Sequence, residues 1–199
     1  MMQTWIALLR GINVGGRNAM PMAELRTTFE SAGCRSVRTY IQSGNVVFAS
    51  PTKSRQNLSK RLGDAIEEQF GFRPSILLLS LDDFCDAVAK NPFLDAVAEP
   101  KTLHFFFLDS VPNSPDMKAI DKLAVPTERF ELIGAVFYLY TPDGFGRSKL
   151  AASAERKLGV PATARNYTTI QNLSEMWGAE NPRSADNKAV RGSGPSRGN

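Results

Sequence analysis

Apolar positions in the first 80 residues change from the spacing of a strand to that of a helix and back. The predicted strand at 4–9 contains the continuous apolar run 5–9, as in a buried strand, whereas residues 21–32 carry apolar side chains on one helical face. The predicted elements are a strand at 4–9, a helix at 21–32, strands at 37–41 and 46–49 around a Ser-Gly-Asn turn, a helix at 58–70 and a strand at 75–79. Their order is β-α-β-β-α-β.

The same order begins again after a helical linker, residues 80–100, which starts with a Ser-x-x-Asp capping pattern. The predicted elements are a strand at 103–108, a helical face of Met117, Ile120 and Leu123, two strands within 129–140 around Gly134, a helix marked by Leu150, Ala154 and Leu158, a strand at 161–165 and a last helix with Ile170, Leu173 and Met176. A sequence alignment that places Gly44 opposite Gly134 matches the two predicted hairpins without a gap.

These patterns predict an α+β fold of two ferredoxin-like β-α-β-β-α-β halves, related by internal duplication, with an added C-terminal helix. The predicted division is a first half at 1–79, the linker at 80–100, a second half at 101–178 and a disordered tail at 179–199. The tail is predicted from its Gly, Pro, Ser and Asn content and its lack of periodicity.

In a sheet of order 4-1-3-2, the end of the first strand and the hairpin between the second and third strands share one edge. The glycine-rich loop at 11–16 should therefore meet the turn at 42–45. In the second half, the helix start after 144–149 and the strand end at Arg165 and Asn166 should share the opposite edge. Packing of the two halves about a pseudo-twofold axis would bring both edges to one cleft.

The formal net charge of +4 over 199 residues does not by itself indicate a class of ligand or partner. The tail holds four basic and two acidic residues, so half of the excess lies outside the predicted folded body. No apolar run reaches the length of a membrane span, and the first residues lack the features of a secretory signal. Cys34 and Cys85 have no CxxC partner and are expected to be free thiols. A cytoplasmic protein without membrane contact is expected.

Side chains for acid–base or metal chemistry are scarce. His104, the only histidine, lies in an apolar strand and is expected to be a packed core residue. One histidine and two separated cysteines assemble neither a zinc site nor a nucleophile–histidine dyad. The sequence therefore predicts no metal and no cofactor, and leaves open an enzyme of unknown reaction that works without a histidine base.

The stretch LLRGINVGGRNAMPM at 8–22 is the main candidate for binding. It matches neither the GxGxxG nor the P-loop pattern. Its glycines either turn a corner or, with the flanking arginines, form a nest of backbone N–H groups for an anion. The candidate ligand-binding residues are Arg10, Asn13, Gly15, Gly16, Arg17, Ser43, Asn45, Ser148, Lys149, Arg165 and Asn166. Ser43 and Asn45 are first of all residues of a hairpin turn, and Ser148 and Asn166 are also explained by helix capping.

The strings ALLRGINVGG, YIQSGNVVF, NPF, SKL and TARNYTTIQNL belong to a resemblance that covers residues 4–177. On these motifs the chain resembles the domain-of-unknown-function family 1697 of uncharacterised bacterial proteins. The resemblance implies an α+β fold of two related halves and no established activity.

Three classes of function follow from the residues. The first is binding of a small anionic, phosphate-bearing ligand, nucleotides included, in the cleft between the halves. The second is a nucleic-acid-binding accessory protein that uses the basic first half and tail. The third is the enzyme without a histidine base.

Overall fold

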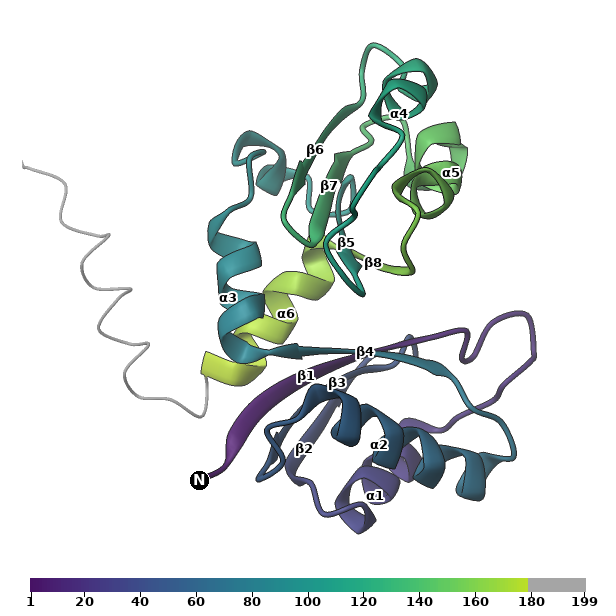
Figure 1. Cartoon of the computed structure of the whole chain (residues 1–199), viewed down its shortest axis with the longest axis vertical. Helices are drawn as coiled ribbons and strands as arrows, with labels where there is room; N and C mark the ends of the chain where they lie inside the picture. The colour runs from purple at the N-terminus through teal and green to yellow at the C-terminus, as the bar shows by residue number, and fades with distance from the viewer. Residues whose placement is uncertain (179–199) are drawn as a thin grey trace, which may run out of the picture.

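Two four-stranded antiparallel sheets form the framework of the computed structural model, which describes residues 1–178 (Figure 1). The predicted tail lies outside the described residues. The first sheet has the order β2-β3-β1-β4, and α1 and α2 cover one of its faces. Its elements are β1 (Gln3–Arg10), α1 (Met22–Ser31), β2 (Arg35–Tyr40), β3 (Asn45–Ser50), α2 (Arg55–Phe70) and β4 (Ser75–Ser80).

The second sheet repeats this arrangement with the order β6-β7-β5-β8, and α4 and α5 cover its outer face. Its elements are β5 (Leu103–Leu108), α4 (Met117–Leu123), β6 (Arg129–Ile133), β7 (Val136–Tyr140), the 3-10 turn η2 (Phe145–Arg147), α5 (Lys149–Leu158) and β8 (Ala162–Asn166). The predicted α+β fold with two β-α-β-β-α-β halves is therefore confirmed, and both sheets have the expected strand order.

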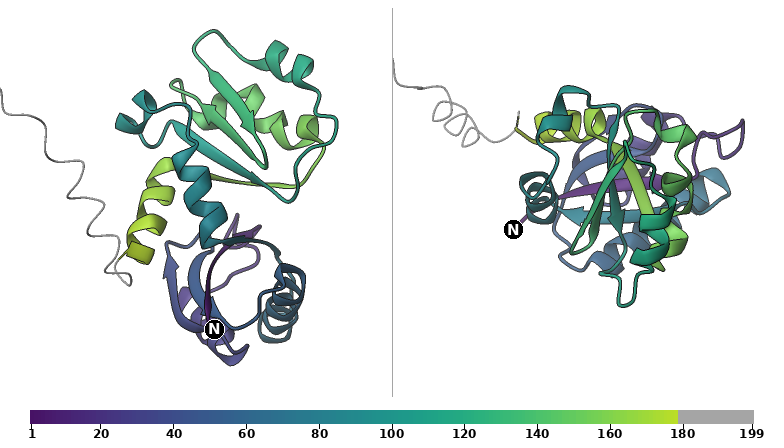
Figure 2. Two further views of the ribbon diagram at one scale, coloured as in Figure 1. Left: turned by 60° about the vertical axis from the view of Figure 1, so that its left-hand side comes forward. Right: turned by 90° about the horizontal axis from the view of Figure 1, so that it is seen from above.

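Two helices lie between the sheets and join the halves. They are α3 (Leu81–Ala89), which leads into the 3-10 helix η1 (Asp95–Ala98), and the predicted C-terminal helix α6 (Tyr167–Gly178) (Figures 1 and 2). One apolar cluster contains Ile6 of β1, Phe84 of α3, Phe105 of β5 and Leu173 of α6. Alternate residues of β1, such as Ala7, face α1 and α2 instead. Because β1 is buried on both faces, its apolar run is continuous.

Local sequence determines where several of these helices begin. Ser80 and Ser148 stand at the N-caps of α3 and α5, and each hydroxyl accepts the N–H of the third helical residue. Each cap pairs one of the N–H groups that the first turn of a helix leaves unsatisfied.

The two hairpin glycines do not hold equivalent positions, so this expectation is wrong. Four residues, 41–44, separate the pair Tyr40 and Asn45 that closes the first hairpin, and Gly44 is the last of them. Only Gly134 and Ala135 separate β6 from β7. Because side chains alternate between the faces of a strand, the unequal turns rule out an alignment through the two glycines. Internal duplication stays a prediction, supported by the shared strand order.

No helix among residues 1–178 is long and apolar enough to cross a membrane.

Candidate functional site

Residues 11–18 form a loop between β1 and α1. Ile12 is buried, whereas residues 14–18 are exposed and include a tight turn. The N–H of Arg17 donates to the carbonyl oxygen of Val14 over 3.0 Å. Between them Gly15 and Gly16 have φ of +58° and +73°. A two-residue turn with positive φ at both positions favours glycine, which adopts it without steric cost. A Cβ atom on either glycine would meet nothing within 4 Å, so the turn, and not crowding, explains both residues.

Two asparagines hold the loop in shape. Asn13 donates from Nδ2 to the carbonyl oxygens of Met20 (3.0 Å) and Gln42 (2.9 Å), and its Oδ1 accepts the N–H of Met20 at 2.7 Å. Asn18 donates to the carbonyl oxygen of Gly11 at 2.7 Å. Both asparagines have φ of +52°, a conformation that asparagine adopts more readily than most residues. The bond to Gln42 confirms that the loop meets the hairpin turn.

In the second half, the start of α5 and the end of β8 are joined through His104. Asn166 is its partner across the sheet. The imidazole ring stacks on Phe145, three residues before Ser148, with 3.9 Å between ring centroids. Ser148 caps α5, and Asn166 Oδ1 accepts the N–H and the hydroxyl of Thr169, each at 3.0 Å, in the first turn of α6. Both predicted polar residues thus have helix-capping contacts.

Arg165 of β8 reaches across to the first half. Its Nε donates to Asn45 Oδ1, and its Nη2 donates to the carbonyl oxygens of Leu9 (2.7 Å) and Ser43 (3.0 Å). Nη1 donates to the carbonyl oxygen of Ala164 at 2.9 Å, so four of the five N–H donors are engaged. No acceptor is a carboxylate, and burial lowers the pKa of Arg165 to about 10. The side chain is therefore still charged at pH 7.

Arg10, the last residue of β1, reaches in the opposite direction. Its Nη1 lies 2.7 Å from Glu155 Oε1 on α5 and donates to the carbonyl oxygen of Ala162 at 2.8 Å. The side chains of Arg10 and Glu155 are 47% and 41% exposed. Arg10 and Arg165 together engage the carbonyl oxygens of Ala162 and Ala164. Unpaired carbonyl groups on an edge strand invite further strand pairing, and the two guanidinium groups occupy them here.

Arg17 and Lys149 are exposed, and neither forms an ion pair within the described chain. Lys149 precedes Glu155 by six residues on α5, which is about 9 Å along the helix axis. It therefore lies away from Arg10. The predicted residues fall into three groups: Arg10, Ser43, Asn45 and Arg165 at the junction of the halves, Asn13, Gly15, Gly16 and Arg17 in the loop, and Ser148, Lys149 and Asn166 at the starts of α5 and α6.

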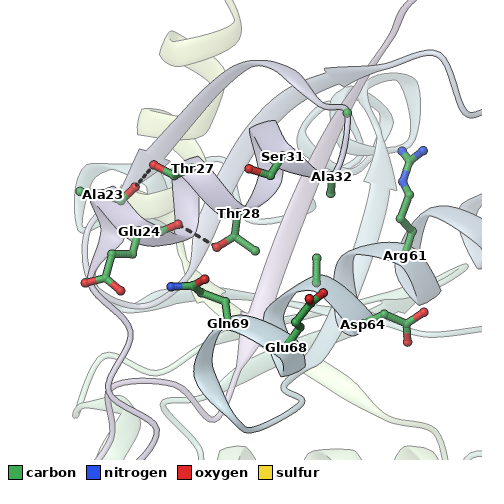
Figure 3. A pocket seen from close by; sticks show the side chains of 12 residues that line it. Ala23, Glu24, Thr27, Thr28, Ser31, Ala32, Arg61, Asp64, Glu68 and Gln69 are labelled. Carbon is green, nitrogen blue, oxygen red and sulfur yellow. Dashed lines mark hydrogen bonds between the residues drawn. The ribbon is translucent and has the colours of Figure 1, made fainter.

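Two cavities lie elsewhere in the described part of the chain. The larger, about 900 Å³, is a groove between α1 and α2 (Figure 3), and the other, about 320 Å³, lies between α3, the end of β5 and the β6–β7 turn. None of the eleven predicted residues lines either cavity. The signal in the sequence was Ala23, Thr27 and Ser31, short side chains repeated every four residues on one face of α1.

The titratable groups of the interior are unsuited to acid–base catalysis or nucleophilic attack at neutral pH. Burial lowers the pKa of His104 to about 4, so the imidazole is neutral at pH 7. Burial also raises the pKa of the Cys34 thiol to about 11. Residues 1–178 contain no group of three or more His, Cys, Asp or Glu side chains that could hold a metal ion.

Comparison with known proteins places the chain among proteins of undefined activity. A solved structure of the conserved bacterial protein SP0830 from Streptococcus pneumoniae is 27% identical, with a TM-score of 0.65, over 88% of this chain and 99% of that chain. A search of curated proteins gave no significant match. The family model described as "Protein of unknown function (DUF1697)" matches residues 2–138. With more than half of its length matched, the chain belongs to the DUF1697 family.

Proposed function

We propose that this protein binds a small anionic, phosphate-bearing ligand at the 11–18 loop. The observation that carries the proposal is the tip of the loop. There Arg17, which is exposed and has no ion pair in the described chain, follows Gly15 and Gly16, which have open space around their Cα atoms. No hydrogen bond among the described residues engages the N–H groups of Gly15 and Gly16. Backbone N–H groups beside a cation are a common means of holding phosphate.

The frame of the loop supports the same proposal. Asn13 and Asn18 fix the backbone through hydrogen bonds of 2.7–3.0 Å, so little conformational entropy remains to be lost when a ligand binds. Arg10 and Arg165 are not assigned to ligand contact in this proposal. Arg165 has its donors engaged by Leu9 and the hairpin turn, and Arg10 is paired with Glu155 of the second half, so the proposal assigns contact with the ligand to Arg17.

A thermal-shift screen of the full chain tests the proposal with inorganic phosphate, ATP, ADP and ribose 5-phosphate. A ligand at a hundred times its Kd adds about 2.7 kcal/mol to the free energy of unfolding. Arg17→Ala should leave the melting temperature of the free protein unchanged, because the side chain is exposed. It should weaken binding about 10- to 100-fold, since a hydrogen bond to a charged group contributes about 1.5–3 kcal/mol.

Arg26→Ala is the matched control, because Arg26 is also exposed and lies outside the loop, on α1. It should bind the ligand as the unaltered protein does. If Arg17→Ala and Arg26→Ala retain equal affinity for the stabilising compound, or if none of the four compounds stabilises the protein, the loop does not bind phosphate.

A further inference from the structure

The groove lies between α1 and α2 (Figure 3), and these two helices cover the face of the first sheet that points away from the second half (Figure 1). Short side chains keep it open, because Thr28, Ala32 and Ala65 are among the residues that line it. Its volume of about 900 Å³ lies within the range of ligand-binding clefts. The two helices therefore leave between them a site large enough for several residues of an extended chain.

Negative charge prevails along this groove. Glu24 on α1 and Glu68 on α2 are exposed, and neither has an ion-pair partner within residues 1–178. Asp64 is already paired with two basic neighbours. Arg61 lies at the end opposite to Glu24 and donates to the Ser50 hydroxyl at 3.3 Å (Figure 3). Two carboxylates are thus left for a cationic occupant.

We propose that the groove binds the basic C-terminal segment of the same chain, with Lys188 and Arg191 at the carboxylates of Glu24 and Glu68. Residues 179–199 include four basic side chains and two acidic ones. The charges of segment and groove are therefore complementary. Because the segment has no apolar face, ion pairs hold it in place, and the groove selects for charge more than for shape.

The length of the segment fits this position. Helix α6 ends at Gly178 beside β2, where Arg38 donates to the carbonyl oxygen of Met176 at 2.8 Å. From there the chain must pass the sheet and the layer of α1 and α2, each about 10 Å thick. The ten residues from 178 to Lys188 span at most about 33 Å, enough to reach the outer groove. Such a tether gives an effective concentration in the millimolar range, so weak ion pairs suffice.

Zero-length cross-linking of the full chain with a carbodiimide tests the proposal, because the reagent joins a carboxylate to a lysine in contact with it. At about 10 mM salt, mass spectrometry should find Lys188 joined to Glu24 or Glu68 of the same molecule. The yield should fall about tenfold at 1 M salt, where the Debye length is only about 3 Å. The pair Lys60 and Asp64, 2.8 Å apart, is the internal control for the reaction.

Two variants separate this groove from other acidic surfaces. The double variant Glu24→Gln/Glu68→Gln should lose the cross-link to Lys188, whereas Glu30→Gln, on α1 but outside the groove, should retain it. Mixing unlabelled and nitrogen-15-labelled protein distinguishes links within one molecule from links between molecules. The proposal is overturned if Lys188 links only between molecules, links to other carboxylates equally often, or does not link while Lys60 and Asp64 do.

Discussion

Replacing Arg165 by methionine removes a guanidinium group that joins the two halves through several hydrogen bonds. The guanidinium group supplies three hydrogen bonds to the first half, to Leu9, Ser43 and Asn45. Asn45 is fully buried, and Leu9 is 1% exposed. Methionine fills a similar volume without a donor, so the Oδ1 atom of Asn45 and the carbonyl oxygen of Leu9 lose the partner that Arg165 provides.

The expected loss of stability follows from these contacts. A hydrogen bond to a charged group contributes about 1.5–3 kcal/mol, and an unpaired buried acceptor costs about 1–3 kcal/mol. The buried guanidinium group of Arg165 has no carboxylate partner, so its burial costs free energy. Removing it offsets part of the loss of stability. We expect the Arg165→Met variant to lose about 3–4 kcal/mol of unfolding free energy, which corresponds to a melting temperature about 6–16 °C lower.

Urea unfolding followed by tryptophan fluorescence measures this loss, since Trp5 is buried and 3% exposed. Arg10→Met is the matched control, because its ion pair with Glu155 is half-exposed and should contribute less than about 1 kcal/mol. Arg165→Lys keeps the charge without the planar fork and should fall between the two. An Arg165→Met variant no less stable than Arg10→Met would refute the reasoning.

Three further predictions concern the interior and the loop. Folding lowers the pKa of His104 from 6.5 to about 4. Between pH 4 and pH 6.5, His104 is therefore protonated in the unfolded chain but neutral in the folded protein. The free energy of unfolding should therefore fall by about 3 kcal/mol as pH drops through this window, and His104→Gln should flatten the corresponding part of the curve of urea midpoint against pH. Ellman's reagent should label exposed Cys85 in the native protein and buried Cys34 only after unfolding; equal rates would contradict the burial. Gly16→Ala, at φ of +73°, should lose about 1–2 kcal/mol in a thermal melt, and an unchanged melting temperature would show that the turn does not hold this conformation.

Local patterns in the sequence were enough to predict the elements of both halves. The strand at Leu103–Leu108 has the predicted bounds, and the helix at Met117–Leu123 contains the predicted helical face of Met117, Ile120 and Leu123. Ser80 and Ser148 mark helix starts because a capping hydroxyl acts on N–H groups within the next three residues. The meeting of the loop at 11–18 with the hairpin turn followed from strand order, which the alternation of elements already implied.

The position of the two helices between the sheets came only from the tertiary structure. The apolar faces of α3 and α6 showed that each helix packs against something, but periodicity carries no information about the partner. The sequence pattern could not predict the register of the two hairpins either. Gly44 and Gly134 mark turns of different length, and turn length decides which face each following residue occupies.

The candidate site shows the same division. The sequence alone predicted that Arg10 and Asn45 lie at one edge of the first sheet and Arg165 at an edge of the second. The meeting of these two edges was expected from packing of the halves about a pseudo-twofold axis. Only the packed halves decide whether a guanidinium group meets solvent, a ligand or the protein. Arg165 donates to four neutral oxygen acceptors, and three of them, in Asn45, Ser43 and Leu9, lie 120, 122 and 156 residues away along the chain. Such long-range contacts depend on the placement of both halves at once, and for this reason no local pattern encodes them.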